Sequence, residues 1–298
     1  MVQISKEATA FRPWLFLLPV ENHAMSPELP DDHITKKTAV LRIPGMEDVT
    51  VRREVEYQTS DAGSLTMDIY SPPDLRAGED RPAVISVAGY PDPGMARIFG
   101  RRYKEWGSST SWARLIAASG MLAITYDNRE PATDVLALLA YLRANGTRHG
   151  VDAKRLGLLA VSGHSPLALS VLMERNARPP LCAALICPLV LDLDGFSAVA
   201  DAAKAFRFAN PTSGKTVDAL PSNAALFIAR AGEDQTPGLN ETLDRFVAKA
   251  FGRNLELTVV NHPQAPHAFD VMQDSDASRA VIRAALAFLR ARLLADPA

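Results

Sequence analysis

Apolar and polar residues alternate along two short stretches after residue 48, and beyond them the chain becomes a series of short, largely apolar runs. VTVRREVEY (49–57) and SLTMDIY (64–70) flank the turn-rich SDAG, which predicts an antiparallel pair of strands at a sheet edge. Six apolar runs follow, at 83–89, 121–126, 155–161, 181–190, 225–232 and 255–260. Runs of this kind are typical of strands that helices cover on both faces.

Helical patterns separate these runs, with apolar residues repeating at intervals of three and four. They lie at 111–119, 133–144, 166–175, 240–251 and 276–294. The alternation predicts an α/β fold with a mostly parallel eight-stranded sheet and helices on both faces. Functional loops in such a sheet gather at the carboxyl ends of the strands. Between two of the predicted strands, residues 195–222 are enough for a small lid but not for a cap domain.

Residues 1–45 show no sustained periodicity, so we interpret them as an N-terminal extension that drapes over the domain or forms part of a lid. Residues 46–298 then form one catalytic domain. The segment PWLFLLPV (13–20) has a proline at each end and no small-residue cleavage site, which argues against a signal peptide. No apolar run approaches the ~18 residues of a membrane-spanning helix. We therefore expect a cytoplasmic protein that does not bind membranes.

Composition narrows the class of partner. The chain has 32 basic and 34 acidic residues, and this balance gives no footprint for nucleic acid or an anionic membrane. Small-molecule substrates are the expected partners, and a homodimer stays open. Cys182 and Cys187 both lie in the predicted strand 181–190, where they would face opposite sides of the sheet. We expect two buried thiols, with no disulfide, metal site or cofactor.

A strand that turns sharply into a helix presents the residue at the turn above the sheet edge, as in the GxSxG elbow of serine hydrolases. The segment RLGLLAVSGHSPLAL (155–169) offers Ser162 and Ser165 for this position. The residue after the nucleophile donates its backbone N–H to the developing oxyanion, and the residue after Ser165 is Pro166, which has no N–H. Gly163 supplies that donor after Ser162. We therefore predict Ser162 as nucleophile, although a helix N-cap is an alternative role for it.

The acid and the base are expected after the serine, in that order. Asp234 follows the apolar run 225–232 and is our candidate for the acid; Asp192 and Asp194 are rivals. His267 lies in a loop after the last predicted strand and is our candidate for the general base, because histidine titrates near neutral pH. Four other histidines are less suited: His262 has less loop with which to reach over the sheet, and His23, His33 and His149 are expected at the surface.

The loop VAGYPDPGMAR (87–97) follows the first of the fully apolar strands and should supply the second oxyanion donor. The N–H of Tyr90 is the candidate, with the tyrosine hydroxyl as an alternative, and Gly89 beside it is a candidate for substrate binding, as are His164 and Arg97. His164, in the first turn after Ser162, either lines the pocket or is solvated. Arginines interleaved with aromatic residues come next and could recognise an acidic or aromatic substrate, unless they form a solvated helix face: Arg97, Arg101 and Arg102.

These residues together resemble the α/β-hydrolase superfamily, and within it the esterases and dienelactone-hydrolase-like members. The resemblance extends over residues 49–294 and rests on RLGLLAVSGHSPLAL, FIARAGEDQ and HPQAPHAFD, which is similar to the GHxF ending of the family. Ala160 and His164 replace the two elbow glycines. The resemblance implies a triad of Ser162, Asp234 and His267 that cleaves a carboxylic ester or a lactone. An acyltransferase, a thioesterase and a catalytically silent binding protein are the alternatives.

Overall fold

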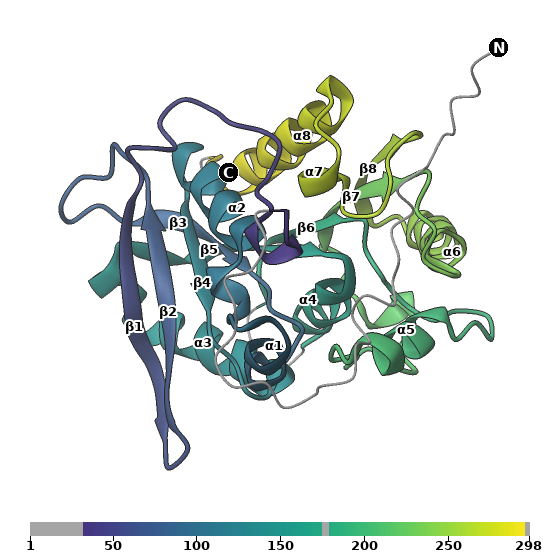
Figure 1. The fold of residues 1–298 in the computed structure, drawn as a ribbon, viewed down its shortest axis with the longest axis horizontal. Coiled ribbons are helices and arrows are strands. Elements are labelled where there is room, and N and C mark those ends of the chain that lie inside the picture. The colour runs from purple at the N-terminus through teal and green to yellow at the C-terminus, as the bar shows by residue number, and fades with distance from the viewer. Residues whose placement is uncertain (1–31, 175–178, 296–298) are drawn as a thin grey trace.

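The computed structural model describes residues 32–174 and 179–295, which are built around one eight-stranded sheet (Figure 1). Its strands are β1 (Thr50–Ser60), β2 (Gly63–Ser71), β3 (Arg81–Ser86), β4 (Leu122–Tyr126), β5 (Val151–Val161), β6 (Cys182–Ile186), β7 (Ala225–Ala231) and β8 (Glu256–His262). The spatial order is β1-β2-β4-β3-β5-β6-β7-β8. β2 pairs antiparallel with both β1 and β4, and the other pairs are parallel. The predicted edge pair and six apolar strands are confirmed.

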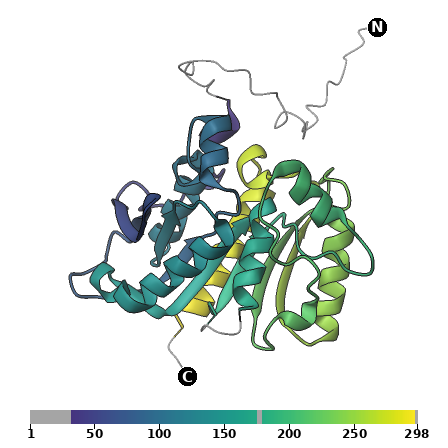
Figure 2. The same ribbon diagram turned by 90° about the horizontal axis from the view of Figure 1, so that it is seen from below.

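Helices cover both faces of the sheet, as the sequence predicts. The helices that match the five predicted ranges are α2 (Gly107–Ala118), α3 (Pro131–Asn145), α4 (Ser165–Leu172), α6 (Leu239–Gly252) and α8 (Asp276–Leu293). α3, α4 and α6 contribute apolar side chains to one core, and α2 and α8 contribute to a second core on the opposite face. Figure 2 shows α8, in yellow, on the far side of the strands from α3 and α4, which are teal.

Three shorter helices complete the fold: α1 (Asp92–Phe99), α5 (Ala198–Phe206) and α7 (Phe269–Met272). α1 begins within residues 87–97, which we expected to be a loop. Proline is well tolerated in the first turn of a helix, where its missing N–H costs no hydrogen bond, and Met95 and Phe99 bury one side of this helix. α5 lies in the segment expected to form the small lid.

Both cysteines are free and buried, but the expectation that they face opposite sides of the sheet is wrong. β6 ends at Ile186, and Cys187 takes a left-handed backbone conformation with φ 38° just beyond it. That turn returns the Cys187 side chain to the same core as Cys182.

The described part of the expected extension packs on the domain. Ala39 and Leu41 are buried against the α2 side of the sheet, and the Ala39 N–H donates to Ser111 Oγ over 2.8 Å. The segment 13–20 and His23 lie outside the described residues. Within the parts of the chain that the structure describes, no helix has the length and apolar content needed to cross a bilayer.

Candidate active site

Ser162 stands at the turn between β5 and the short helix η5 (Ser162–His164). Its φ is +54°, a left-handed value that is costly for a residue with a Cβ. Non-glycine residues in this region persist where the surrounding structure holds them, and they gather at active sites. The backbone therefore has the conformation that a nucleophile elbow requires, without the two glycines of the usual pattern.

The side chains of Ser162, His267 and Asp234 form one hydrogen-bonded relay. Ser162 Oγ lies 2.7 Å from His267 Nε2, and His267 Nδ1 lies 2.5 Å from Asp234 Oδ2. Because a carboxylate only accepts, His267 donates from Nδ1 and its Nε2 is left to accept the serine proton. Asp234 also accepts the N–H of Thr236. Burial alone would raise the pKa of Asp234, but the hydrogen bond and charge of His267, together with the hydrogen bonds from Thr236, outweigh burial and lower that pKa.

Backbone hydrogen bonds join the loop that carries the acid to the loop that carries the histidine. The Gly232 N–H donates to the His262 carbonyl over 2.9 Å, and the Glu233 N–H donates to the Ala265 carbonyl over 2.8 Å. These bonds couple the ends of β7 and β8, so the relay is held by main chain on both sides. The two loops that carry Asp234 and His267 are therefore tied to each other by main-chain hydrogen bonds.

The rival residues have other surroundings. Ser165 is fully buried, and His262 is buried with its Nε2 3.2 Å from Ser278 Oγ. Asp192 accepts two backbone N–H groups at the start of α5, and Asp194 pairs with Lys249. His33 and His149 are partly buried, away from the relay, beside Thr35 and Tyr141. None of these takes part in the Ser162 relay.

The 87–91 loop, which follows β3, lies directly against the elbow. A Cβ placed on Gly163 would come within 2.5 Å of Tyr90 Oη, so the tyrosine hydroxyl adjoins the residue that follows Ser162. Its apolar surroundings raise the pKa of Tyr90, which keeps the hydroxyl protonated and able to donate. The Gly89 N–H points elsewhere, because it donates to His164 Nδ1 over 2.7 Å. The Gly163 N–H and Tyr90, through its N–H or its hydroxyl, thus remain the candidate oxyanion donors.

Three solved esterases are similar in structure. A thermophilic esterase from Thermogutta terrifontis with bound propionate is 18% identical at a TM-score of 0.59, with 85% of this chain and 98% of that chain covered. A thermostable esterase from Pseudomonas putida is 13% identical at a TM-score of 0.64, with 84% and 85% covered. A bacterial heroin esterase is 15% identical at a TM-score of 0.61, with 83% and 86% covered. No family model and no curated protein sequence matches the chain.

The chain has the α/β-hydrolase fold. At these identities the likeness establishes architecture, and the strand order agrees with the predicted class. The finer dienelactone-hydrolase-like assignment stays a prediction. As in other α/β-hydrolase folds, the Ser162 relay lies at the carboxyl ends of the parallel strands.

A cavity of about 500 Å³ opens over the Ser162 relay of this hydrolase fold. Aromatic and aliphatic side chains form most of its wall, from α1, from the segment 103–106, from the lid and from the N-terminal Ile34. The expectation that His164 is solvated is wrong, since it is buried and lines this cavity. Such apolar cavities with few polar groups are typical of small-molecule sites.

Gly89 and Arg97 are not among the lining residues, which corrects their assignment to substrate binding: Gly89 is buried, and Arg97 is exposed on α1. Apart from the two histidines, the acidic or basic side chains that line the cavity are Arg207 on the lid and Asp270. Asp270 is buried, accepts the Trp112 indole N–H over 2.8 Å, and has its pKa raised by burial. The sequence signals for these two were slight: Asp270 closes the HPQAPHAFD motif, and Arg207 lies in the expected lid.

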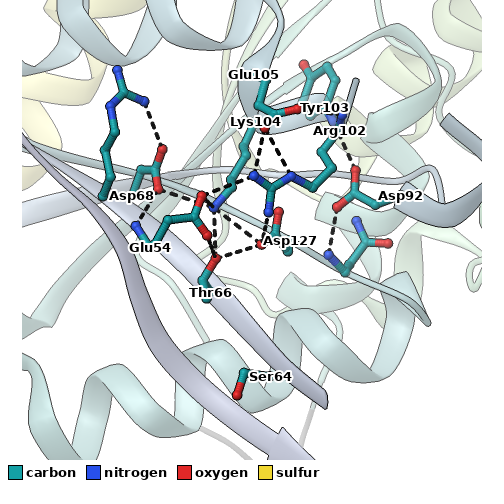
Figure 3. A network of polar contacts seen from close by, with 12 residues as sticks. Glu54, Ser64, Thr66, Asp68, Asp92, Arg102, Tyr103, Lys104, Glu105 and Asp127 are labelled. Atoms are coloured by element: carbon teal, nitrogen blue, oxygen red, sulfur yellow. Dashed lines mark hydrogen bonds and ion pairs between the residues drawn. The ribbon is translucent and has the colours of Figure 1, made fainter. Parts of the chain in front are cut away.

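A group of charges with Lys104, Asp68 and Asp127 buried at its centre lies beside Tyr103 of the cavity wall, and we call it the lysine cluster: Glu54, Asp68, Arg102, Lys104 and Asp127 (Figure 3). Arg102 and Lys104 flank Tyr103 on the short helix η3 (Tyr103–Glu105) and point into the cluster. The two roles considered for Arg102 were substrate recognition and a solvated helix face, but its guanidinium is instead occupied by Asp127 and Glu54. Among the described residues, no group of three or more His, Cys, Asp or Glu side chains is placed to hold a metal ion.

Proposed function

We propose that this protein is a serine esterase that hydrolyses carboxylic esters of small molecules. The observation that carries the proposal is the relay from Ser162 Oγ to His267 Nε2, at 2.7 Å, built on a strained turn. Structural neighbours named as esterases support it, and one of them has been seen phosphoramylated by tabun.

Each relay residue would have one role in the reaction. His267 Nε2 takes the proton of Ser162 as Oγ bonds to the ester carbonyl carbon, and Asp234 stabilises the imidazolium that forms. Gly163 and Tyr90 donate hydrogen bonds to the oxyanion. His267 then returns the proton to the leaving alcohol, which leaves an acyl group on Ser162. A water molecule, activated by His267, releases the acid and restores the serine.

The cavity supports an ester with an apolar or aromatic portion. Its wall is mostly hydrophobic, with Tyr103, Trp106 and Phe206 among the aromatic side chains. The volume of about 500 Å³ is suited to a small molecule and not to a protein segment. A cytoplasmic location and a homodimer stay predictions, which cell fractionation and light scattering would test.

A fluorophosphonate probe, with mass-spectrometric mapping of the labelled residue, tests the proposal. We expect label on Ser162, turnover of p-nitrophenyl acetate, and loss of both in Ser162→Ala. Asp234→Asn should keep the fold but lose about 10⁴-fold in kcat, because the amide favours the wrong histidine tautomer. Label on Ser165, or full turnover by Ser162→Ala, would refute the mechanism. An inert wild-type protein would favour the catalytically silent alternative.

A further inference from the structure

His164 occupies the position where the usual elbow has its last glycine, and its side chain makes an unusual contact. The imidazole is buried beneath the cavity, and its Nδ1 accepts the Gly89 N–H over 2.7 Å. Two tyrosine rings enclose it: the centroid of Tyr103 lies 4.1 Å away and that of Tyr90 lies 4.9 Å away. A contact this well enclosed holds the ring in one orientation.

The same contact fixes the protonation state of the ring. An imidazole nitrogen that accepts an N–H carries no proton, so neutral His164 bears its hydrogen on Nε2. Burial lowers the pKa of His164 to about 3, so the ring stays neutral over the range in which His267 can act as a base. His164 is therefore a constant hydrogen-bond acceptor and takes no part in proton transfer.

The acceptor acts on the backbone of the 87–91 loop. A Cβ on Gly89 would come within 3.0 Å of both the Gly163 carbonyl oxygen and His164 Cα, so the loop and the elbow are in close contact there. The next residue is Tyr90, whose ring packs edge-on against His164 and Phe208. A shift of the Gly89 N–H would therefore move Tyr90 relative to Gly163.

Tyr103, whose ring contacts the His164 ring, is itself held in place by neighbouring residues. Tyr103 donates its backbone N–H to Asp92 Oδ1 over 2.9 Å. Its neighbours Arg102 and Lys104 anchor η3 in the lysine cluster, and Figure 3 shows Tyr103 on the opposite side of that turn. The Tyr103 ring thus contacts the His164 ring, whose Nδ1 accepts the Gly89 N–H, and the residues on either side of Tyr103 are anchored in the lysine cluster.

We propose that His164 is a positioning residue: its Nδ1 holds the Gly89 N–H so that Tyr90 is aimed at the oxyanion formed on Ser162. This inference rests on the proposed esterase function, and it explains why an imidazole can replace the elbow glycine. By this inference His164 helps to stabilise the transition state, through Tyr90, and does not contribute to substrate binding. Loss of the acceptor should consequently lower kcat and leave KM nearly unchanged.

Two matched variants separate the acceptor from the bulk of the ring. His164→Asn places an amide oxygen close to the position of Nδ1, and His164→Leu fills similar space without an acceptor. We expect His164→Leu to lose about 10- to 100-fold in kcat, because removing a whole oxyanion donor costs roughly 10²- to 10³-fold. KM should change less than about threefold, and His164→Asn should recover most of the loss. The acidic limb of the kcat/KM profile should not move in the active variant, because His164 does not titrate there.

Hydrogen exchange of the peptide covering residues 87–91, measured by mass spectrometry, gives a second result that needs no activity. Exchange should be faster in His164→Leu than in the wild-type protein and near normal in His164→Asn, with equal far-UV circular dichroism in all three. Equal kcat for His164→Leu and wild type, equal losses in both variants, or an effect confined to KM would overturn the proposal. If the wild-type protein has no esterase activity, the proposed function fails, and unchanged exchange in His164→Leu would separately reject the positioning role.

Discussion

Replacing Lys104 with methionine removes the buried cation at the centre of the lysine cluster. The Lys104 side chain is 1% exposed, and its Nζ lies 2.9 Å from Glu54, 3.2 Å from Asp68 and 3.3 Å from Asp127. Burial alone would lower the pKa of Lys104, but the hydrogen bond with Glu54 and the charges of Asp127 and Asp68 raise it. The native protein therefore holds this lysine charged.

The expected loss follows from what the substitution leaves behind. Methionine fills nearly the same volume, so little cavity forms. Asp68 and Asp127 stay buried, with side chains 3% and 9% exposed, and lose a cation within hydrogen-bonding reach. Breaking a buried ion pair by removing one partner costs about 3 to 5 kcal/mol. Arg53 and Arg102 still contact these carboxylates, so we expect the lower end, about 3 kcal/mol.

Arg53→Met is the matched control, because Arg53 pairs with the same carboxylate from the solvent side. Its side chain is 59% exposed and lies 3.2 Å from Asp68, the same separation as Lys104. An exposed pair is screened by water and contributes about 0 to 1 kcal/mol. The two cations thus lie at the same distance from Asp68, but Lys104 is buried and also contacts Glu54 and Asp127.

Urea unfolding at neutral pH, followed by circular dichroism and extrapolated to water, measures both variants. We expect Lys104→Met to lose at least about 2 kcal/mol more than Arg53→Met. Similar losses in the two proteins, or a loss below about 1 kcal/mol for Lys104→Met, would refute the reasoning that burial makes this cation important.

Three further outcomes follow from the site and its surroundings. Ser162→Gly should have a free energy of unfolding in urea about 0.5 to 1 kcal/mol higher than that of Ser162→Ala, because glycine tolerates the φ of +54° and neither variant has a hydroxyl. Equal stability of the two variants would refute backbone strain at this position. Gly163→Ala should lose at least about tenfold in kcat, because its Cβ would meet Tyr90 Oη at 2.5 Å, whereas Gly252→Ala, away from the cavity, meets nothing within 4 Å and should stay active. Burial alone would raise the pKa of Glu54, but hydrogen bonds from Thr66, Lys104 and Arg102 lower it from 4.5 to about 2. The ionised Glu54 therefore stabilises the folded protein above pH 4.5, and this stabilisation is lost as pH falls towards 2. The free energy of unfolding, measured in urea across this pH range, should consequently fall less steeply with acid in Glu54→Gln than in the wild-type protein.

The sheet and its main helices could be predicted because each is encoded locally. An apolar run of strand length, or an apolar stripe at helical spacing, specifies its element without knowledge of distant residues. Ser162 could be distinguished from Ser165 for the same reason, since Pro166 is adjacent in sequence. Asp234 and His267 were selected by the chain order of acid and histidine after the serine and by the rule that functional loops follow the strands at one sheet edge.

The contacts that were mispredicted depend on distant parts of the chain. Arg102 lies near the predicted oxyanion loop in sequence, but carboxylates from β1 and the loop after β4 occupy its guanidinium. Arg97 faces solvent because the buried side of α1 is taken by Met95 and Phe99. Hydrophobic periodicity can show that a helix has a buried side, but not which distant acid a charged side chain will meet.

At the altered elbow, a hydrogen bond between residues far apart in sequence accompanies the loss of the usual glycine. Small residues at the elbow normally allow the strand, the helix and the oxyanion loop to come close together. Here the side chain of His164 fills that space, and the loop still comes close at Gly89, where a Cβ would meet backbone atoms of the elbow, the Gly163 carbonyl oxygen and His164 Cα, at 3.0 Å. The Gly89 N–H then bonds to the imidazole that displaced the glycine. A pattern search that demands glycine at 164 therefore misses this serine, although the backbone at Ser162 has the conformation of an elbow.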